Sequence, residues 1–309
     1  MESAVTYPQL RLGTAPDSWG VWFPDDPRQV MWSTYLDEVR DAGYSLTELG
    51  PYGYLPTDPA RLRDELDARA LTLTGGTVFV GLHKGKDALV KAKADCDEEM
   101  ATIGPLGARH LIILPEGYTD LDGNVTGPTT LRDDEWDALN EGMSELGRYV
   151  AEEHGAVLTF HTHADSHVGT QAEIERFLDG TDPDTVHLCL DSGHVAYCGA
   201  DNLGIIADYP ERIAYVHLKQ VDVAIRERAQ RERLGFAPAV RLGAMVEPPL
   251  GEPEMPSFLA ALGALDRDLY CIVEQDLYPC EPDVPLPVAR RIREYFEAHG
   301  LVGDRPGND

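Results

Sequence analysis

Short apolar runs recur along the chain, and most of them precede a segment whose apolar residues follow a helical period. Several runs, such as HLIIL, AVLTF and YCIVE, are almost continuously apolar, which is the pattern of strands covered on both faces. The candidate strands are Leu10–Thr14, Ser45–Leu49, Leu71–Val80, His110–Leu114, Ala156–His161, Val186–Asp191, Ile213–His217 and Leu269–Glu274. Because strands and helices alternate, the pattern predicts a parallel sheet built from eight repeats.

Amphipathic segments fill the stretches between these runs. Several begin after Asp, Thr or Pro, or end at a glycine, which are common helix starts and stops. The expected helices cover residues 32–43, 58–70, 87–108, 134–155 and 170–180, and a final helix covers Leu286–His299. The polar tail at residues 301–309 is expected to fray.

The eight repeats lack the glycine-rich motifs that bind nucleotide phosphates, since neither GxGxxG after the first strand nor GxxxxGK[ST] occurs. This favours a closed (β/α)8 TIM barrel, an α/β fold, over an open doubly wound sheet. No linker-like change in composition divides residues 1–309, so we expect a single domain with a core of about residues 10–300. Two inserts, Glu116–Thr130 and Val221–Pro256, follow candidate strands and should lie on the C-terminal face, where active sites of this fold are built.

Acidic side chains outnumber basic ones by 54 to 26, which gives a formal net charge of −28. A surface this negative repels nucleic-acid phosphates and anionic lipids, so neither nucleic acid nor a membrane is an expected partner. No apolar stretch approaches the roughly 20 residues that span a bilayer, and the N-terminus lacks the pattern of a secretory signal. Five cysteines without a CxxC pair argue against a disulfide framework. We expect a soluble protein of the reducing cytoplasm.

Ionisable side chains, most of them able to bind a divalent metal, follow four consecutive candidate strands at their C-terminal ends. They are His161, His163 and His167 for the fifth strand, Asp191 and His194 for the sixth, His217, Lys219 and Asp222 for the seventh, and Glu274 and Asp276 for the eighth. The ends of neighbouring strands meet at one mouth of a closed barrel. Imidazole nitrogens with carboxylate oxygens suit Mn, Co, Zn, Fe or Mg, and the absence of thiolates argues against a structural zinc site.

Alternation along each strand narrows the roles, because residues two apart point to the same face. The assigned metal ligands, one from each strand, are His161, Asp191, His217 and Glu274. On the fifth strand His163 is the alternative ligand. The side chains left to act on substrate are His163, His194, Lys219 and Glu116, the last being a candidate base just past the fourth strand.

Residues after the first two strands are candidates for contact with a sugar-like substrate. They are Trp19, Glu48, Tyr52 and Tyr54, and packing is an equal alternative for the aromatic ones. Any one histidine or carboxylate is readily explained as structural, and only their recurrence at successive strand ends indicates a site. His167 and Asp276 are interpreted as structural. The remaining histidines, His83, His110, His154, His187 and His299, are interpreted as surface or packing residues.

A set of motifs extends from about residue 12 to residue 276. It comprises LGTAPDSWG, AGYSLTELGPYGYLPTDP, GGTVF, FHTHADSHVGTQAEIERFL, LDSGH, YPERIAYVHLKQV and VEQD. With these motifs the chain resembles the xylose isomerase-like TIM-barrel superfamily, the sugar phosphate isomerase/epimerase group, and within it the inosose dehydratase branch. The resemblance implies a divalent ion, manganese first, held by His161, Asp191, His217 and Glu274. It also implies a small polyhydroxylated carbonyl substrate and often a homo-oligomer.

Two motifs depart from the pattern of the group. The seventh strand commonly reads HxKD, and here Gln220 replaces the acid in HLKQ. The segment PPLGEPEMPSF replaces a common PLGEGxVDF, so the loop before the next helix is expected to be reshaped.

The expected activity begins with removal of a proton next to a carbonyl, by Glu116 or His163. Loss of water from an inosose or similar keto-polyol, with His194 or Lys219 as the acid, is the first expectation. The alternatives are a keto-sugar or keto-inositol epimerase or isomerase, and a lyase of 3-keto-glycosides. A barrel without catalysis that binds a polyol or a partner is the alternative outside enzymes.

Overall fold

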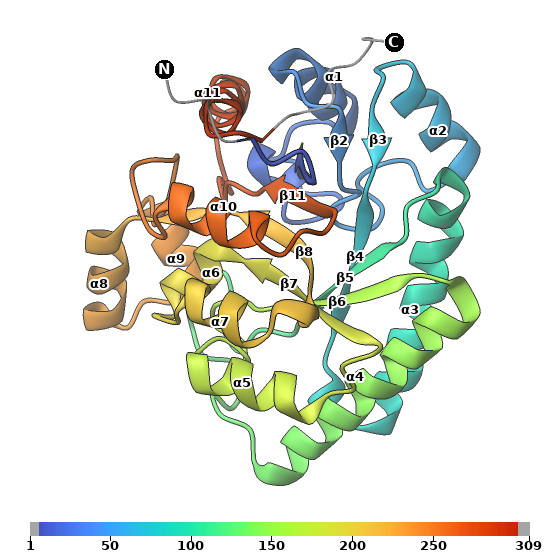
Figure 1. The fold of residues 1–309 in the computed structure, drawn as a ribbon, viewed down its shortest axis with the longest axis vertical. Coiled ribbons are helices and arrows are strands. Elements are labelled where there is room, and N and C mark those ends of the chain that lie inside the picture. The colour runs from blue at the N-terminus through green and yellow to red at the C-terminus, as the bar shows by residue number, and fades with distance from the viewer. Residues whose placement is uncertain (1–5, 302–309) are drawn as a thin grey trace.

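The computed structural model describes residues 6–301 and shows a parallel sheet curled into a barrel with helices around it (Figure 1). The barrel strands are β1 (Leu10–Thr14), β2 (Leu46–Thr47), β3 (Thr72–Leu73), β4 (Gly75–Val80), β5 (His110–Pro115), β6 (Val157–His161), β7 (Val186–Asp191), β8 (Ile213–Leu218) and β11 (Leu269–Val273). Their order is β3-β2-β1-β11-β8-β7-β6-β5-β4, with every pair parallel. The predicted single α/β domain with a TIM-barrel architecture is confirmed. The predicted fraying of the tail concerns residues 302–309, outside those described.

The third predicted strand, Leu71–Val80, is divided into β3 and β4 at Thr74. Here the chain changes partner, because β3 pairs with β2 and β4 pairs with β5. Thr74 donates its N–H to the carbonyl of Thr47 at 2.9 Å, and its hydroxyl shares a hydrogen bond of 2.7 Å with Tyr215 inside the barrel. The two ends of the strand order are therefore consecutive in the chain, and this divided strand closes the barrel.

The helices that surround the barrel agree with the expected segments to within a few residues. Two of them end earlier than expected, at residue 67 instead of 70 and at residue 103 instead of 108. The surrounding helices are α1 (Trp32–Ala42), α2 (Pro59–Asp67), α3 (Lys86–Ile103), α4 (Asp133–His154), α5 (Gln171–Gly180) and α11 (Pro285–Ala298). Local chemistry sets several ends: Asp58 caps α2 by accepting from the N–H of Arg61, and Thr170 begins α5 with a capping box. The helix predicted to reach residue 108 ends at Ile103, because Pro105 follows in a short 3-10 turn.

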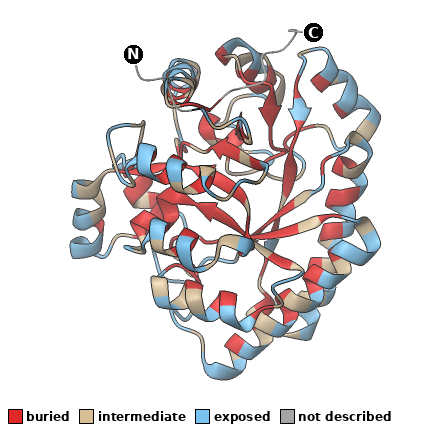
Figure 2. Cartoon of the chain, in the orientation of Figure 1, coloured by how far each residue is buried: buried red, intermediate tan, exposed pale blue. Residues whose placement is uncertain are grey.

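Among residues 6–301, buried apolar side chains form three clusters, one of which packs the insert Val221–Pro256 and includes Phe236, while the other two are the layers of the barrel. The larger one lies between the strands and the inward faces of the helices, where Figure 2 shows the buried residues, while exposed residues lie on the outer helix faces. The smaller one fills the barrel itself and consists of Ala15, Ile112, Cys189, Tyr215 and Ile272. All five cysteines are free, as the sequence predicts. In the described part of the chain, no helix is both long and apolar enough to cross a membrane.

Both long inserts follow strands and lie at the C-terminal side of the barrel, as predicted. The insert after β8 contains β9 (Gln220–Val221), α8 (Val223–Glu232), α9 (Phe236–Arg241) and β10 (Met245–Val246), with β9 and β10 antiparallel. Two short helices, α6 (Ser192–Tyr197) and α7 (Asn202–Asp208), follow β7, and α10 (Met255–Gly263) precedes β11. Asp222 caps α8 by accepting from the N–H of Ile225 at 2.8 Å, which gives this residue a structural role.

Candidate metal centre

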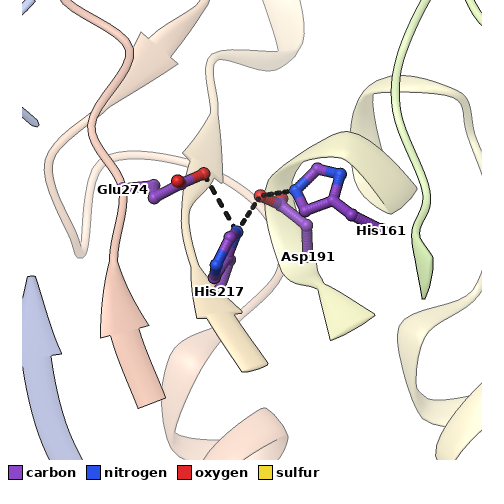
Figure 3. A group of neighbouring side chains, drawn as sticks. All are labelled: His161, Asp191, His217 and Glu274. Atoms are coloured by element: carbon purple, nitrogen blue, oxygen red, sulfur yellow. Dashed lines mark hydrogen bonds and ion pairs between the residues drawn. The ribbon is translucent and has the colours of Figure 1, made fainter. Parts of the chain in front are cut away.

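The C-terminal mouth of the barrel collects four side chains that each offer one metal-ligand atom. His161 ends β6, Asp191 ends β7, His217 lies near the end of β8, and Glu274 directly follows β11. The four ligand atoms all lie within 4.8 Å of one another. Figure 3 shows the side chains converging from these neighbouring strands. The structure brings together the four residues assigned as ligands from the strand pattern.

The alternation of the strands explains why these side chains converge. Three of them stand two positions after a residue of the barrel interior, and these interior residues are Cys189, Tyr215 and Ile272. Side chains two apart share a face, so Asp191, His217 and Glu274 also point inward, one layer closer to the mouth. The register places Asp191 opposite His217, and Ile272 opposite His217 on the other side.

The cluster is buried, and its atoms face one another at ion-pair distances. His161 Nε2 lies 3.3 Å from Asp191 Oδ2, and His217 Nδ1 lies 3.0 Å from Glu274 Oε2 and 3.7 Å from Asp191 Oδ2. The other oxygen of Asp191 accepts from the N–H groups of Gly193 and His194 at the start of α6. These two bonds fix the carboxylate with Oδ2 turned toward the cluster.

Glu48 holds His217 from the side away from the cluster, where its Oε1 lies 2.8 Å from His217 Nε2. Since a carboxylate only accepts, His217 Nε2 carries a hydrogen, and a neutral ring then has a free lone pair on Nδ1. His217 Nδ1 is buried and faces the carboxylates of Glu274 and Asp191, which fits a position where a metal would bind. Burial lowers the pKa of His217, but nearby anionic groups, Glu274 and Glu48 among them, raise it well above its usual value overall, so without a cation Nδ1 also carries a proton, which a bound cation would replace. The same negative potential attracts a divalent cation.

Lys219 lies next to this cluster with its ammonium group among carboxylates. Its Nζ is 2.8 Å from Asp276 Oδ2, 3.2 Å from Glu274 Oε2 and 3.3 Å from Asp191 Oδ2, and Asp17 Oδ2 is 3.9 Å away. Burial would lower the pKa of Lys219, yet these carboxylates hold it well above its ordinary value, so the side chain stays charged. Asp276, interpreted from sequence as structural, therefore belongs to the cavity wall and to the surroundings of Lys219.

The carboxylates around Lys219 divide into two kinds. For Asp191 and Glu274 burial alone would raise the pKa, but Lys219 and the cluster histidines hold it well below the ordinary value. For Asp17 and Asp276 burial prevails and the pKa is raised. The carboxylates of Asp191 and Glu274 are therefore ionised, which is the form in which a carboxylate binds a metal.

His163 and His194 lie side by side on the cavity wall, with ring centroids 4.0 Å apart. His163 Nδ1 donates to the carbonyl of Ala164 at 2.6 Å, and His194 Nδ1 accepts from the N–H of Ala164 at 3.1 Å. Burial lowers the pKa of His163 to about 4 and that of His194 well below its usual range. Both rings are therefore neutral near pH 7, with a free lone pair on His163 Nε2 and a hydrogen on His194 Nε2.

The other predicted site residues lie at the rim of the cavity or outside it. Glu116 is half exposed at the cavity rim and forms an ion pair with Lys84. Trp19 is fully buried, donates its indole N–H to Glu38 at 2.7 Å and packs edge-on against Tyr35, outside the residues that line the cavity.

The two tyrosines after the second strand also face other parts of the protein. The Tyr52 hydroxyl lies 3.5 Å from Thr102, and the Tyr54 hydroxyl donates to the carbonyl of Val30 at 3.0 Å. Neither tyrosine lines the cavity among the described residues. Substrate contact by these tyrosines and by Trp19 stays a prediction, and the structure places all three in packing positions.

Three of the side chains that line the cavity, Asp17, Trp22 and Phe236, have no role in the sequence-based prediction. Asp17 follows β1 just as the assigned ligands follow their strands, so the same rule applied to the first strand would have found it. Trp22 donates its indole N–H to Asp17 Oδ1 at 2.6 Å. Phe236 comes from the insert after β8 and carries no periodic signal. The cavity that these side chains share with the metal-ligand cluster has a volume of about 830 Å³.

Comparison with known proteins places this geometry among sugar-converting barrels. The family model described as "Xylose isomerase-like TIM barrel" matches residues 36–297. An inosose dehydratase from Clostridium perfringens is 29% identical over 294 residues, which cover 93% of this chain and 97% of that protein. An inosose dehydratase from Geobacillus kaustophilus is 30% identical over 301 residues, which cover 93% and 94%.

Among solved structures, a protein described as IOLI with a bound zinc atom matches with a TM-score of 0.69. The match covers 94% of this chain and 98% of that protein at 14% identity. At this identity the likeness shows a shared fold.

Proposed function

The chain belongs to the xylose isomerase-like TIM barrel family, and from that premise we propose that it is a metal-dependent dehydratase of an inosose or a similar keto-polyol. The observation that carries the proposal is the cluster of His161, Asp191, His217 and Glu274 in a cavity that also contains neutral histidines and a charged lysine. Similarity to inosose dehydratases along nearly the whole chain favours dehydration over other outcomes of the same chemistry.

The four clustered residues would hold one divalent ion, with manganese as the first candidate and Co, Mg, Zn or Fe as the others. Bound there, the ion would polarise a carbonyl oxygen and favour loss of the proton on the neighbouring carbon. Two imidazoles with two carboxylates match the donor types of these ions, and His217 Nδ1, which is directed at Glu274 and Asp191, fits the role of a ligand. Glu48 would orient His217 from outside the ligand set rather than bind substrate, which changes the role predicted for it.

His163 would accept the proton next to the carbonyl. Its Nδ1 hydrogen is directed to the carbonyl of Ala164, so Nε2 holds the lone pair that takes a proton. The imidazolium of His163 would pass this proton on to the β-hydroxyl, which leaves as water, and the neutral Nε2–H of the adjacent His194 would donate a hydrogen bond to that hydroxyl. Lys219 would remain charged and donate hydrogen bonds to the oxyanion that forms. Glu116 is the alternative base at the rim.

A lyase of 3-keto-glycosides is the second candidate. A cavity of about 830 Å³ is near the upper end of the range of small-molecule sites, so a substrate with a second ring also fits. The lyase, like an epimerase or isomerase, would begin with the same proton transfer to His163.

The test is incubation of the manganese-loaded protein with 2-keto-myo-inositol in D2O, followed by NMR and mass spectrometry. Loss of water with formation of a diketone supports the dehydratase. Deuterium uptake without loss of water would contradict it in favour of an epimerase or isomerase. If no exchange occurs, the keto-inositol proposal is wrong, and 3-keto-glycosides are tried under the same conditions.

A further inference from the structure

Asp165 joins three loops at the mouth of the barrel. It lies in the loop after β6, and its backbone carbonyl accepts from the N–H of Tyr118 at 2.8 Å. Its side-chain Oδ2 accepts from the hydroxyl of Thr119 at 2.7 Å and from the N–H of Phe236 at 2.6 Å. Tyr118 and Thr119 belong to the insert after β5, and Phe236 begins α9 in the insert after β8. One carboxylate oxygen therefore connects both long inserts.

The two inserts also contact each other beside Asp165. A Cβ placed on Gly235 would lie 2.6 Å from the Cα of Gly123, and one on Gly123 would lie 2.8 Å from Pro238, so the backbones approach closely only with glycine at both positions. Arg241 adds a hydrogen bond of 2.7 Å to the carbonyl of Leu121. The inserts form one continuous roof whose contacts meet at Asp165.

Phe236 connects this roof to the residues proposed for proton transfer. Its ring centroid lies 4.8 Å from that of His194 and 5.3 Å from that of His163. It also stacks on Trp22 from the loop after β1, with ring centroids 6.4 Å apart and an angle of 14° between the ring planes. The hydrogen bond to Asp165 Oδ2 is donated by the backbone N–H of Phe236 itself. The carboxylate therefore fixes the position of the backbone from which the phenyl ring extends.

Asp165 adopts a backbone conformation that few residue types favour. Its φ is +55°, in the left-handed region, where Asp and Asn are tolerated better than most residues with a Cβ. The loop places its carbonyl and its carboxylate toward the two inserts at once. This combination of a strained backbone and a shared acceptor is typical of a residue that positions its neighbours.

We propose that Asp165 is a positioning residue that holds the roof together and keeps Phe236 against His163 and His194, so that these two histidines present their Nε2 atoms to the substrate. The inference rests on the proposed function for its effect on turnover. The placement of Phe236 against His163 and His194 by Asp165 does not depend on that function and is measured without any substrate. Asp165 also lines the cavity, and its effect on His163 and His194 is exerted through Phe236.

The test compares Asp165→Gly with Asp165→Asn in the full-length chain. Glycine accepts the left-handed backbone without strain and removes the acceptor, whereas asparagine keeps an oxygen with two lone pairs for Thr119 and Phe236. We expect Asp165→Gly to lower kcat/KM by roughly 10- to 100-fold, mainly in kcat, with metal content unchanged. Asp165→Asn should restore kcat/KM to within about threefold of the wild type.

NMR of histidine-labelled protein supplies the readout that needs no turnover. Loss of the Phe236 contact should shift the ring signals of His163 and His194 in Asp165→Gly and leave them near their wild-type positions in Asp165→Asn. Asp122→Gly, which removes an exposed carboxylate from the insert after β5, is the matched control and should change neither rate nor spectrum.

Two results would overturn the inference: unmoved histidine signals in Asp165→Gly, or a loss of kcat/KM in Asp165→Asn as large as in Asp165→Gly. If the wild-type protein turns over none of the keto-polyols, the proposed function fails by itself, and the histidine spectra still decide whether Asp165 positions Phe236.

Discussion

His163 and His217 illustrate at the scale of single residues how two buried histidines acquire different roles. His217 has one nitrogen bonded to Glu48 and the other directed at Glu274 and Asp191. His163 has one nitrogen bonded to a backbone carbonyl, and its ring lies against His194 rather than within the carboxylate group. The first environment suits a metal ligand, and the second suits a neutral base.

These environments predict a contrast between two alanine variants. His163→Ala should lower kcat at least ~100-fold and leave the metal content nearly intact, because only the proton acceptor is lost. His217→Ala should lose both turnover and metal, because one of four ligands is removed. The measurements are steady-state kinetics and metal analysis of the purified proteins. Normal turnover in His163→Ala, or full metal retention in His217→Ala, would refute the respective role.

At the scale of elements, the two departures from the family pattern contact each other. Gln220 in β9 accepts from the N–H of Gly251 at 3.1 Å and donates to the carbonyl of Pro253 at 2.6 Å. Both partners lie in the segment PPLGEPEMPSF. An ionised acid at this position would accept from Gly251 but would have no hydrogen to donate to Pro253. The glutamine thus matches the reshaped loop, which lies outside the residues that line the cavity at the barrel mouth.

Replacing Gln220 with an acid of the same length should therefore weaken the fold without altering the chemistry. We expect Gln220→Glu to reduce the free energy of unfolding by roughly 1–3 kcal/mol, because the carbonyl of Pro253 loses its donor and a buried carboxylate is introduced. Urea denaturation measures the change, and kcat/KM should stay close to that of the wild type. Gln230→Glu, on the exposed side of α8, is the control. Equal stability of both variants would show that the bond to Pro253 contributes nothing.

For the whole molecule, buried neutral histidines connect stability to pH. At the N-terminal end of the barrel, His110 packs between Tyr215 and Tyr270, and burial lowers its pKa to about 4. Burial also lowers the pKa of His187. In the unfolded chain both would titrate near 6.5, so the unfolded state takes up protons first as the pH falls. The folded state therefore loses stability from about pH 6.5 down toward pH 4.

We expect His110 alone to make the free energy of unfolding lower by about 2 kcal/mol at pH 5 than at pH 7.5. His110→Phe keeps an aromatic ring beside the two tyrosines and removes the titrating group, so it should flatten the pH dependence by that amount. Urea unfolding of both proteins across this pH range measures the difference. An unchanged pH dependence in the variant would show that His110 does not carry this effect.

The position of eight strands and of the ligand cluster could be read from the sequence because both depend on local rules. Buried parallel strands are continuously apolar, and side chains two apart share a face, so His161, Asp191, His217 and Glu274 had to meet once the barrel closed. Applied to β1, the same rule would also have found Asp17.

Only the tertiary structure decided the contacts between segments that have no fixed spacing. It divided the third predicted strand at Thr74, because closure of the barrel pairs the part before Thr74 with β2 and the part after it with β5. It turned Glu48 toward His217 and buried Trp19 away from the cavity. It also brought Phe236 next to His163 and His194 through an irregular insert. Periodicity records which face of an element is buried, whereas barrel closure and loop packing decide which distant side chains meet there.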